Sequence, residues 1–477
     1  RGGMLRIPVA WGRLTSRYDS LLAANLDADI PEDRWIMLSH CRAWLVYQGY
    51  SQALNTDCLE AFEADDDTGG TWRYHIPTGQ GEDVIVNLGL KMIAGENAVQ
   101  LALYRQPHGG VAGRLKDSRP VQLILRPDIE NRNFHQTTKA YLGPEKEWPQ
   151  KVSCTQQAFR FTPDTDHSLR MQISKGEFIA EPEWQYMVHR AVDADRGLDP
   201  DSDLFSPGYF SVFLEGGQLV TVAAEIVQTP ETAPADIIGM TRRLPGPVAS
   251  GATDGGTPRD VLTRALDDFV VRRGELKSVI AGYPWFLDWG RDALIFSRGL
   301  IAAGKLDDAR MILKQFGRFE RQGTLPNMIH GNDAGNRDTS DAPLWFIRTC
   351  AELIEAEDAD GFLEETCGGR TIRQILLSIG QSFMTQTPNG ICMDAESGLI
   401  FSPVHFTWMD TDHPAGTPRQ GYPIEIQALW CAALEILAAV DQEEHHAQWR
   451  QLSATVKSSI LKLFWNEDLG FLSDCLH

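Results

Sequence analysis

The feature that most constrains the fold of this chain is a change in its hydrophobic period across a Gly/Pro-rich segment. Before that segment, apolar residues alternate with small or polar ones at 99–103 and again at 169–173, which is the period of half-buried β-strands. After it, Leu262, Leu266 and Phe269 recur at helical spacing. A β-rich part is therefore expected to precede a helical part.

The boundaries of these parts follow from local composition. Residues 1–230 predict a β-sandwich domain, because short strands recur at close spacing, and 210–226 predict a hairpin whose turn is Glu215–Gln218. Residues 231–258 are expected to form a linker, since 245–258 are dominated by Gly, Pro and small residues. Residues 259–477 predict about seven helices, near 262–269, 291–303, 305–321, 341–357, 370–387, 426–437 and 449–463.

The composition excludes several classes of partner. The 477 residues carry a formal net charge of −21, whereas nucleic acids and anionic membranes are bound through clustered Lys and Arg. A neutral sugar remains compatible. The eight cysteines are scattered without a C-x-x-C pair, which predicts reduced thiols in a cytoplasmic protein and no zinc site. No metal and no organic cofactor are expected.

One segment combines aromatic rings with charged groups. Residues 282–292 contain four aromatic side chains, two carboxylates and one arginine. Aromatic faces stack on sugar rings, and Arg291 with Asp292 could hold several hydroxyl groups at once. The segment therefore indicates a pocket for a neutral polyhydroxylated substrate. The alternative is a core segment that carries an exposed Arg291–Asp292 ion pair.

Two further loops place aromatic residues beside carboxylates. The first is 336–345, which contains Asp341, and the second is 406–425. Each lies where one helix ends or the next begins, so a closed ring of helices would bring their carboxylates together. Hydrolysis of a glycosidic bond needs two carboxyl groups in one site. One carboxylic acid protonates the leaving oxygen, and a second carboxylate activates water or attacks carbon.

Asp410 is the candidate acid of this set. It follows two aromatic residues and a methionine, and an apolar wall favours the protonated form of a carboxyl. The alternatives are structural. Asp410 could be a helix N-cap or a plain loop residue, Asp341 could cap its own helix, and Glu425 could simply favour the positive end of a helix.

The quoted loops resemble a known family. Residues 282–292 match its pattern Trp-Phe-x-Asp-Trp-Gly-Arg-Asp, and 407–410, 417–419 and 424–430 match its second pattern in order and spacing. With 15–22, 33–35 and 206–210, these stretches resemble the amylo-α-1,6-glucosidase part of glycogen debranching enzymes and its bacterial stand-alone relatives. The resemblance implies a β-sandwich followed by an (α/α)6 barrel. It also implies inverting hydrolysis of α-1,6-linked glucose at the branch points of glycogen or a related branched α-glucan.

The resemblance also implies roles for single residues. Asp410 matches the general acid, and Arg291 with Asp292 match a pair that grips the non-reducing glucose. The other positions expected to line the pocket are Trp289, Asp341, Trp408, Arg419 and Glu425.

The chain departs from the family pattern in two places. Residues 337–342 read Arg-Asp-Thr-Ser-Asp-Ala, where the family commonly has Tyr-Asn-Thr-x-Asp-Ala, so Asp341 is retained while the Tyr and Asn are replaced. About seven helices are predicted, against about twelve in a complete barrel, and no residue matches the family's general base, a Glu near the end of that barrel. We therefore expect a truncated chain with an incomplete (α/α)6 barrel that is inactive alone.

Two other functions stay open. One is another helical-barrel glucosidase, of the trehalase-like or glucosylglycerate type. The other is a non-catalytic glucan-binding protein. The sequence determines neither the branch length of the substrate nor the oligomeric state.

Overall fold

The chain folds into two compact units. The computed structural model describes residues 3–27, 29–65, 69–227, 257–283, 285–358, 361–412, 414–441 and 446–477. Contacts between Cα atoms divide the chain into Arg1–Asp27 with Asp33–Asp254, and Ala28–Glu32 with Gly255–His477. Residues 29–32 thus belong with the helical unit although they lie early in the sequence. Most of the expected linker, 231–256, lies outside the described residues.

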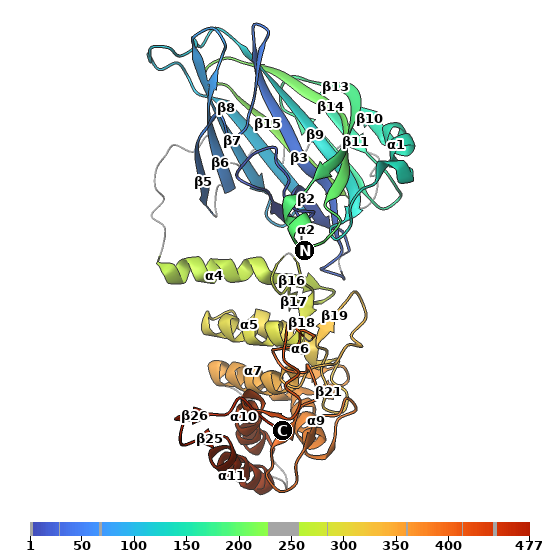
Figure 1. The fold of residues 1–477 in the computed structure, drawn as a ribbon, viewed down its shortest axis with the longest axis vertical. Coiled ribbons are helices and arrows are strands. Elements are labelled where there is room, and N and C mark those ends of the chain that lie inside the picture. Colours follow the sequence, from blue (N-terminus) through green and yellow to red (C-terminus); the bar gives the residue numbers. More distant parts are fainter. Residues whose placement is uncertain are drawn as a thin grey trace. The chain divides into compact units, whose positions relative to one another are not determined.

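The first unit contains two antiparallel sheets, most of whose strands are labelled in Figure 1. One has the order β1-β2-β3-β9-β14-β13, with β4 beside β3. Its strands are β1 Met4–Arg6, β2 Ser20–Asn25, β3 Arg34–Tyr47, β4 Tyr50–Ala53, β9 Val121–Asn133, β13 Glu177–His189 and β14 Asp201–Leu214. The other has the order β10-β11-β12-β15-β8-β7-β6-β5. Its strands are β5 Leu59–Asp65, β6 Gly69–Pro77, β7 Asp83–Met92, β8 Ala98–Arg105, β10 Val152–Cys154, β11 Ala158–Phe161, β12 Ser168–Ile173 and β15 Leu219–Val227.

The two sheets share one hydrophobic core and so form a β-sandwich. The predicted alternation is confirmed in β8, where Val99, Leu101 and Leu103 are fully buried. It is also confirmed in β12, where Leu169 and every second residue after it in the strand are fully buried. Side chains on alternate positions of a strand point to the same face, which is why this pattern could be read from the sequence. Short helices join some strands: η1 Ala140–Leu142, α1 Pro144–Glu147, η2 Trp148–Lys151 and α2 Ala191–Asp195.

The predicted hairpin at 210–226 is wrong. The turn at Glu215–Gln218 is present, but β14 pairs with β9 and β13, whereas β15 pairs with β12 and β8 in the other sheet. The turn therefore carries the chain from one sheet to the other. Hydrophobic alternation reports that a strand has a buried face, but two strands facing one core across a sandwich show the same alternation as two strands paired in a hairpin.

The second unit contains the predicted helices. Seven of its described helices have at least twelve residues: α4 Pro258–Phe269, α5 Gly290–Ala302, α6 Leu306–Gly317, α7 Ala342–Glu357, α9 Ile372–Thr385, α10 Ile424–Val440 and α11 His446–Leu463. Helix α7 packs against α5, α6 and α10. Helix α10 also packs against α9 and α11. Figure 1 shows α5, α7, α10 and α11 as successive layers of this unit.

Short strands lie in the loops between these helices and after α11. The strands are β16 Val270–Arg273, β17 Leu276–Val279, β18 Asp288–Trp289, β19 Met328–Ile329, β20 Thr366–Cys367, β21 Arg370–Thr371, β22 Cys392–Met393, β23 Ile400–Phe401, β24 Tyr422–Pro423, β25 Trp465–Asn466, β26 Phe471–Leu472 and β27 Cys475–Leu476, and a short helix α8 spans Gly361–Glu364. Within the described part of the chain, no helix combines the length and apolar character that a membrane crossing needs. All eight cysteines are free.

Candidate active site

The first predicted loop leads directly into α5. Its last residues form β18, which pairs with β19 and places Trp289 immediately before the helix. Gly290 begins the helix, and a Cβ atom there would lie 2.4 Å from the carbonyl oxygen of Pro326. Only glycine allows this approach, so the glycine of the Trp-Gly-Arg-Asp pattern fixes where α5 starts. Arg291 and Asp292 consequently lie in its first turn.

Arg291 joins the other two loops. Its Nε donates to Asp341 Oδ2 at 2.5 Å and its Nη2 donates to Asp341 Oδ1 at 3.2 Å. Nη2 also donates to the carbonyl oxygen of Thr407 at 2.7 Å, and Nη1 lies 3.3 Å from Asp410 Oδ2. Burial would lower the pKa of Arg291, but Asp341 and then Asp410 outweigh it and raise that pKa. The guanidinium is thus a fixed positive charge between two carboxylates.

Asp341 occupies the N-cap position of α7 without acting as its cap. Its side chain makes no capping hydrogen bond to the helix. Its carboxylate is buried and accepts from Arg291 and from Thr339 Oγ1, the latter at 2.7 Å. The structural alternative raised for this residue therefore does not describe its side chain, which is directed to the loop cluster.

Asp410 lies in the long loop between β23 and β24, well before α10, so it is not the N-cap of that helix. Its side chain is about one quarter exposed. Trp408 on the same loop is 58% exposed, and the loop therefore presents one aromatic face and one carboxylate to solvent. Phe286, 53% exposed, lies edge-on to Trp289 with ring centroids 6.5 Å apart.

Arg419 anchors this loop to α10. Its guanidinium donates to both carboxylate oxygens of Glu425, to Asp474 at 2.9 and 3.0 Å, and to Thr407 Oγ1 at 3.1 Å. These bonds, led by those to Glu425, raise the pKa of Arg419 against the effect of burial. Arg419 also lies over the Trp408 ring, 5.9 Å from its centroid.

Thr407 connects the two arginines. Its backbone carbonyl accepts from Arg291 and its hydroxyl accepts from Arg419. Since Thr407 is fully buried, this pair of bonds fixes the backbone immediately before Trp408 and Asp410. The structure thus brings Arg291, Asp341 and Asp410 into direct contact, and links them through Thr407 to Arg419 and Glu425.

Asp292 is exposed to solvent, but its carboxyl lies near the charged groups of the Arg291 cluster. Displacement of water by the protein raises the pKa of its carboxyl, Arg291 opposes this, and the nearby Asp341 and Asp410 carboxylates raise it further. Such a group can accept hydrogen bonds from a ligand and can hold a proton at a higher pH than an ordinary aspartate.

Asp288 has a structural role beside the site. It is fully buried and accepts from Arg273 Nε at 2.7 Å. The same guanidinium donates to Glu32 at 3.0 and 3.1 Å and to the carbonyl oxygen of Gly331 at 2.7 Å. Burial, followed by the charge of Asp288, raises the pKa of Glu32. This cluster holds the start of α5 in place.

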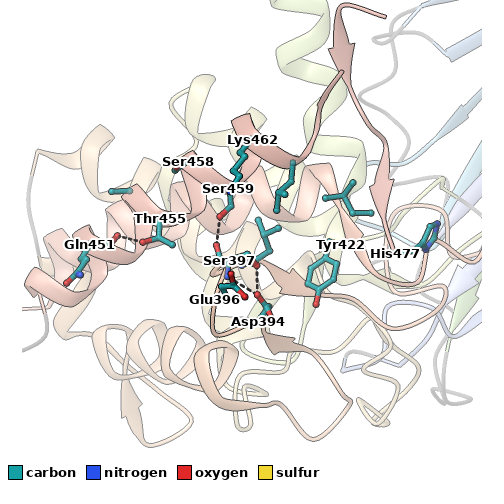
Figure 2. Close-up of a pocket in the computed structure, with 14 residues that line it drawn as sticks. Asp394, Glu396, Ser397, Tyr422, Gln451, Thr455, Ser458, Ser459, Lys462 and His477 are labelled. Atoms are coloured by element: carbon teal, nitrogen blue, oxygen red, sulfur yellow. Dashed lines mark hydrogen bonds between the residues drawn. The ribbon is translucent and has the colours of Figure 1, made fainter. Parts of the chain in front are cut away.

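A groove elsewhere in this unit contains no predicted site residue. This groove of about 860 Å³ lies between α11 and the loop that contains Asp394 and Ser397 (Figure 2). Ser459 on α11 donates to the carbonyl oxygen of Ser397 at 2.8 Å and ties the two walls together. Among the described residues, no group of three or more His, Cys, Asp or Glu side chains could hold a metal ion.

Comparison with known families decides the identity of the chain. A family described as "Glycogen debranching enzyme N terminal" matches residues 1–221, and one described as "Amylo-alpha-1,6-glucosidase" matches residues 264–477. The chain belongs to the glycogen debranching enzyme family. The resemblance read from the two loop patterns is thereby confirmed, and the family places the chain among glycoside hydrolases.

One of two similar solved structures supports the fold of this family member. A bacterial glucoamylase in complex with acarbose is 10% identical with a TM-score of 0.50, and the match covers 97% of this chain and 70% of that one. A putative kojibiose phosphorylase from the human microbiome is 9% identical with a TM-score of 0.44, and the match covers 92% and 61%. The first likeness is one of fold. No curated protein sequence matches the chain.

The departure of this family member at 337–342 also has a structural explanation. Arg337 donates to the carbonyl oxygens of Phe319 and Thr324, at 2.7 and 2.9 Å. Its carbonyl oxygen accepts from Asn389 Nδ2 at 2.7 Å. Arg337 therefore fastens this loop to its neighbours, and Asp341 is the residue of the loop that reaches the Arg291 cluster.

Three contributors to the site were missed from the sequence. They are Thr407, Asp474 and Glu32. Thr407 was read only as a member of the second loop pattern, and Asp474 lies in a segment without a recognisable pattern. Glu32 lies in the N-terminal part of the sequence and belongs to no motif recognised there. A buried carboxylate needs a cation, but the sequence does not reveal which distant arginine supplies it.

Proposed function

We propose that this chain carries the substrate-gripping part of an inverting α-glucosidase that cleaves α-1,6-linked glucose at branch points of glycogen or a related α-glucan. The observation that carries this proposal is the convergence of Arg291, Asp341 and Asp410 from three loops beside the exposed Trp408. Family membership supports the same reaction class. In this proposal, α4 to α11 are the larger part of an (α/α)6 barrel.

Substrate binding follows from the chemistry of the site. Arg291 and Asp292 hold hydroxyl groups of the terminal glucose, because a guanidinium donates in fixed directions and a carboxylate accepts two or more bonds. Asp341 orients Arg291 and is a positioning residue. Trp408 and Trp289 supply aromatic faces for the sugar ring. Arg419 and Glu425 hold the Trp408 loop and line the pocket wall.

Bond cleavage requires a proton donor and a base. Asp410 donates its proton to the glycosidic oxygen while a water molecule attacks the anomeric carbon from the opposite face, which inverts its configuration. Asp410 Oδ2 must exchange its long contact with Arg291 for that oxygen. The base that deprotonates the water would stand about 6.5–9.5 Å from the acid. The family resemblance implies a Glu for this role that no residue of the 477 matches.

The decisive variant is Asp410→Asn, in a form of the protein that releases glucose from limit dextrin. We expect a loss of about 10²- to 10⁴-fold in kcat, the usual contribution of general acid catalysis. Activity on α-glucosyl fluoride should largely survive, because fluoride leaves without protonation. The matched control is Asp412→Asn, an exposed neighbour on the same loop. Equal losses on both substrates would show that Asp410 is not the acid.

The stereochemistry and the linkage can be tested on the same preparation. The first product observed by proton NMR should be β-glucose, since inversion of an α-linkage gives the β-anomer. Glucose release from limit dextrin with no release from trehalose would distinguish the proposed activity from a trehalase-like one. The reverse preference would overturn the proposal.

A non-catalytic glucan-binding role is the second candidate, because the exposed Trp408 ring can stack on a sugar that is not cleaved. It predicts that the 477-residue chain binds glycogen and releases no glucose, and that no longer form of the protein releases any. Glucose release by the 477-residue chain itself would show that one of its own carboxylates serves as the base.

A further inference from the structure

The outer face of one sheet of the sandwich carries an exposed aromatic side chain beside a groove. The strand register aligns Val46, Gln122 and Phe213 across β3, β9 and β14. Ser211, two residues before Phe213 on β14, points to the same face. Phe213 is 57% exposed, although it lies within a central strand of the sheet. An exposed phenyl ring at such a position is not needed for the core.

A groove of about 480 Å³ opens beside this ring. Its walls come from the turn between β12 and β13, from the 215–218 turn after β14, and from Pro120 and Gln156. Gly176 forms part of its floor, where a Cβ atom would lie 2.4 Å from the carbonyl oxygen of Ser211. The volume falls in the range of sites that hold small molecules, roughly 300–1,000 Å³.

Two side-chain hydrogen bonds lie at or beside the groove. Lys175 Nζ donates to Gln218 Oε1 at 2.9 Å, and Gln122 Nε2 donates to Ser211 Oγ at 2.9 Å. Hydrogen-bonding side chains therefore stand in the same groove as the Phe213 ring. One lysine stands with two carboxylates, those of Glu177 and Glu215, so the groove does not favour a polyanion. An aromatic ring beside side chains that can both donate and accept hydrogen bonds suits a neutral polyhydroxylated chain.

We propose that this groove is an auxiliary binding site for an α-glucan chain, with the Phe213 ring stacked on a glucose unit and Lys175, Glu177 and Gln218 bonding its hydroxyl groups. The site belongs to the sandwich unit and is distinct from the Arg291 cluster, which belongs to the helical unit. The identity of the sugar rests on the proposed function. The site would hold the polymer and would not take part in bond cleavage.

The test is affinity electrophoresis of the 477-residue chain in native gels that contain glycogen, together with titration by maltoheptaose. Phe213→Ala should weaken binding about five- to tenfold, the order expected for the loss of one aromatic stacking face. Phe213→Trp should bind at least as tightly as the wild type. Tyr141→Ala is the matched control, because Tyr141 is an exposed aromatic of the same unit that lies outside the groove.

The outcomes separate this proposal from the catalytic one. Wild-type affinity in Phe213→Ala, or an equal loss in Tyr141→Ala, would overturn the auxiliary site and leave the function of the Arg291 cluster untouched. A loss confined to Phe213→Ala supports the site, even if no form of the protein cleaves a branch point. Thermal melting of each variant shows whether it is folded, and a loss of binding by Phe213→Trp with a normal melt would also count against stacking.

Discussion

Nη1 of Arg291 lies 3.3 Å from Oδ2 of Asp410, although 119 residues separate them in the sequence. The same guanidinium makes two bonds to Asp341, so one side chain of the first loop joins the second and third loops. A change in Arg291 should therefore disturb both the grip on the sugar and the position of the proposed acid.

Arg291→Lys tests this coupling. Lysine keeps the positive charge but cannot donate in the two fixed directions that Asp341 and Asp410 require. We expect kcat/KM on limit dextrin to fall by about 10²-fold or more, as for a misplaced reacting group. The matched control is Arg298→Lys on the same helix, which pairs with Glu352 instead. If both variants lose the same activity, the geometry of Arg291 is not what matters.

Gly290→Ala tests the position of the first turn of α5. A Cβ atom at Gly290 would lie 2.4 Å from the Pro326 carbonyl oxygen, so the turn with Arg291 must shift. We expect a clear loss of kcat. Gly299→Ala in the same helix meets only Leu266 at 3.7 Å, and should stabilise the protein by about 0.5–1 kcal/mol through helix propensity. Normal kinetics in Gly290→Ala would contradict this account.

The sequence predicted these loops better than it predicted what holds them. Helical spacing predicted the seven longer helices, and the loops between them contain Arg291, Asp341 and Asp410, which the structure brings together. Thr407 and Glu32 could not be found in this way, because each acts through a contact with a distant residue that leaves no periodic trace. The hairpin error at 210–226 has the same origin, since alternation defines a buried face and not a pairing partner.

Arg273→Ala should strongly destabilise the helical unit. Arg273 is the guanidinium that bonds both Glu32 and Asp288, and its loss leaves two buried carboxylates facing one another. Removing one partner of a buried ion pair costs about 3–5 kcal/mol, which thermal or urea denaturation would detect. The control is Arg272→Ala, an exposed neighbour on the same strand.

A second substitution shows whether charge is the cause. In the Arg273→Ala background, Glu32→Gln removes one of the two buried charges and should restore part of the lost stability. If the double variant is as unstable as the sum of the two single losses, then lost packing of the arginine, and not an uncompensated charge, explains the effect.

Asp292→Asn should raise stability at neutral pH while lowering activity. The pKa of Asp292 is raised in the folded protein, chiefly because protein displaces water from its carboxyl. The folded state then binds its proton more tightly than the unfolded state, so stability falls as pH rises from the unfolded pKa, about 4, through the higher folded pKa. Below that window both states are protonated and the carboxyl contributes nothing. The asparagine variant escapes this loss.

Thermal melts between about pH 4 and pH 7 would follow the difference. The variant should melt higher than the wild type at neutral pH, and the gain should shrink as the pH falls to about 4. Asp307→Asn is the matched control, because Asp307 is an exposed carboxylate in the first turn of α6. It should lose the favourable interaction with the helix end, about 0.3–1 kcal/mol. The opposite result is that the variant melts lower than the wild type at neutral pH and that this deficit shrinks towards about pH 4. It would mean that the ionised carboxylate stabilises the fold and is not held there for the substrate.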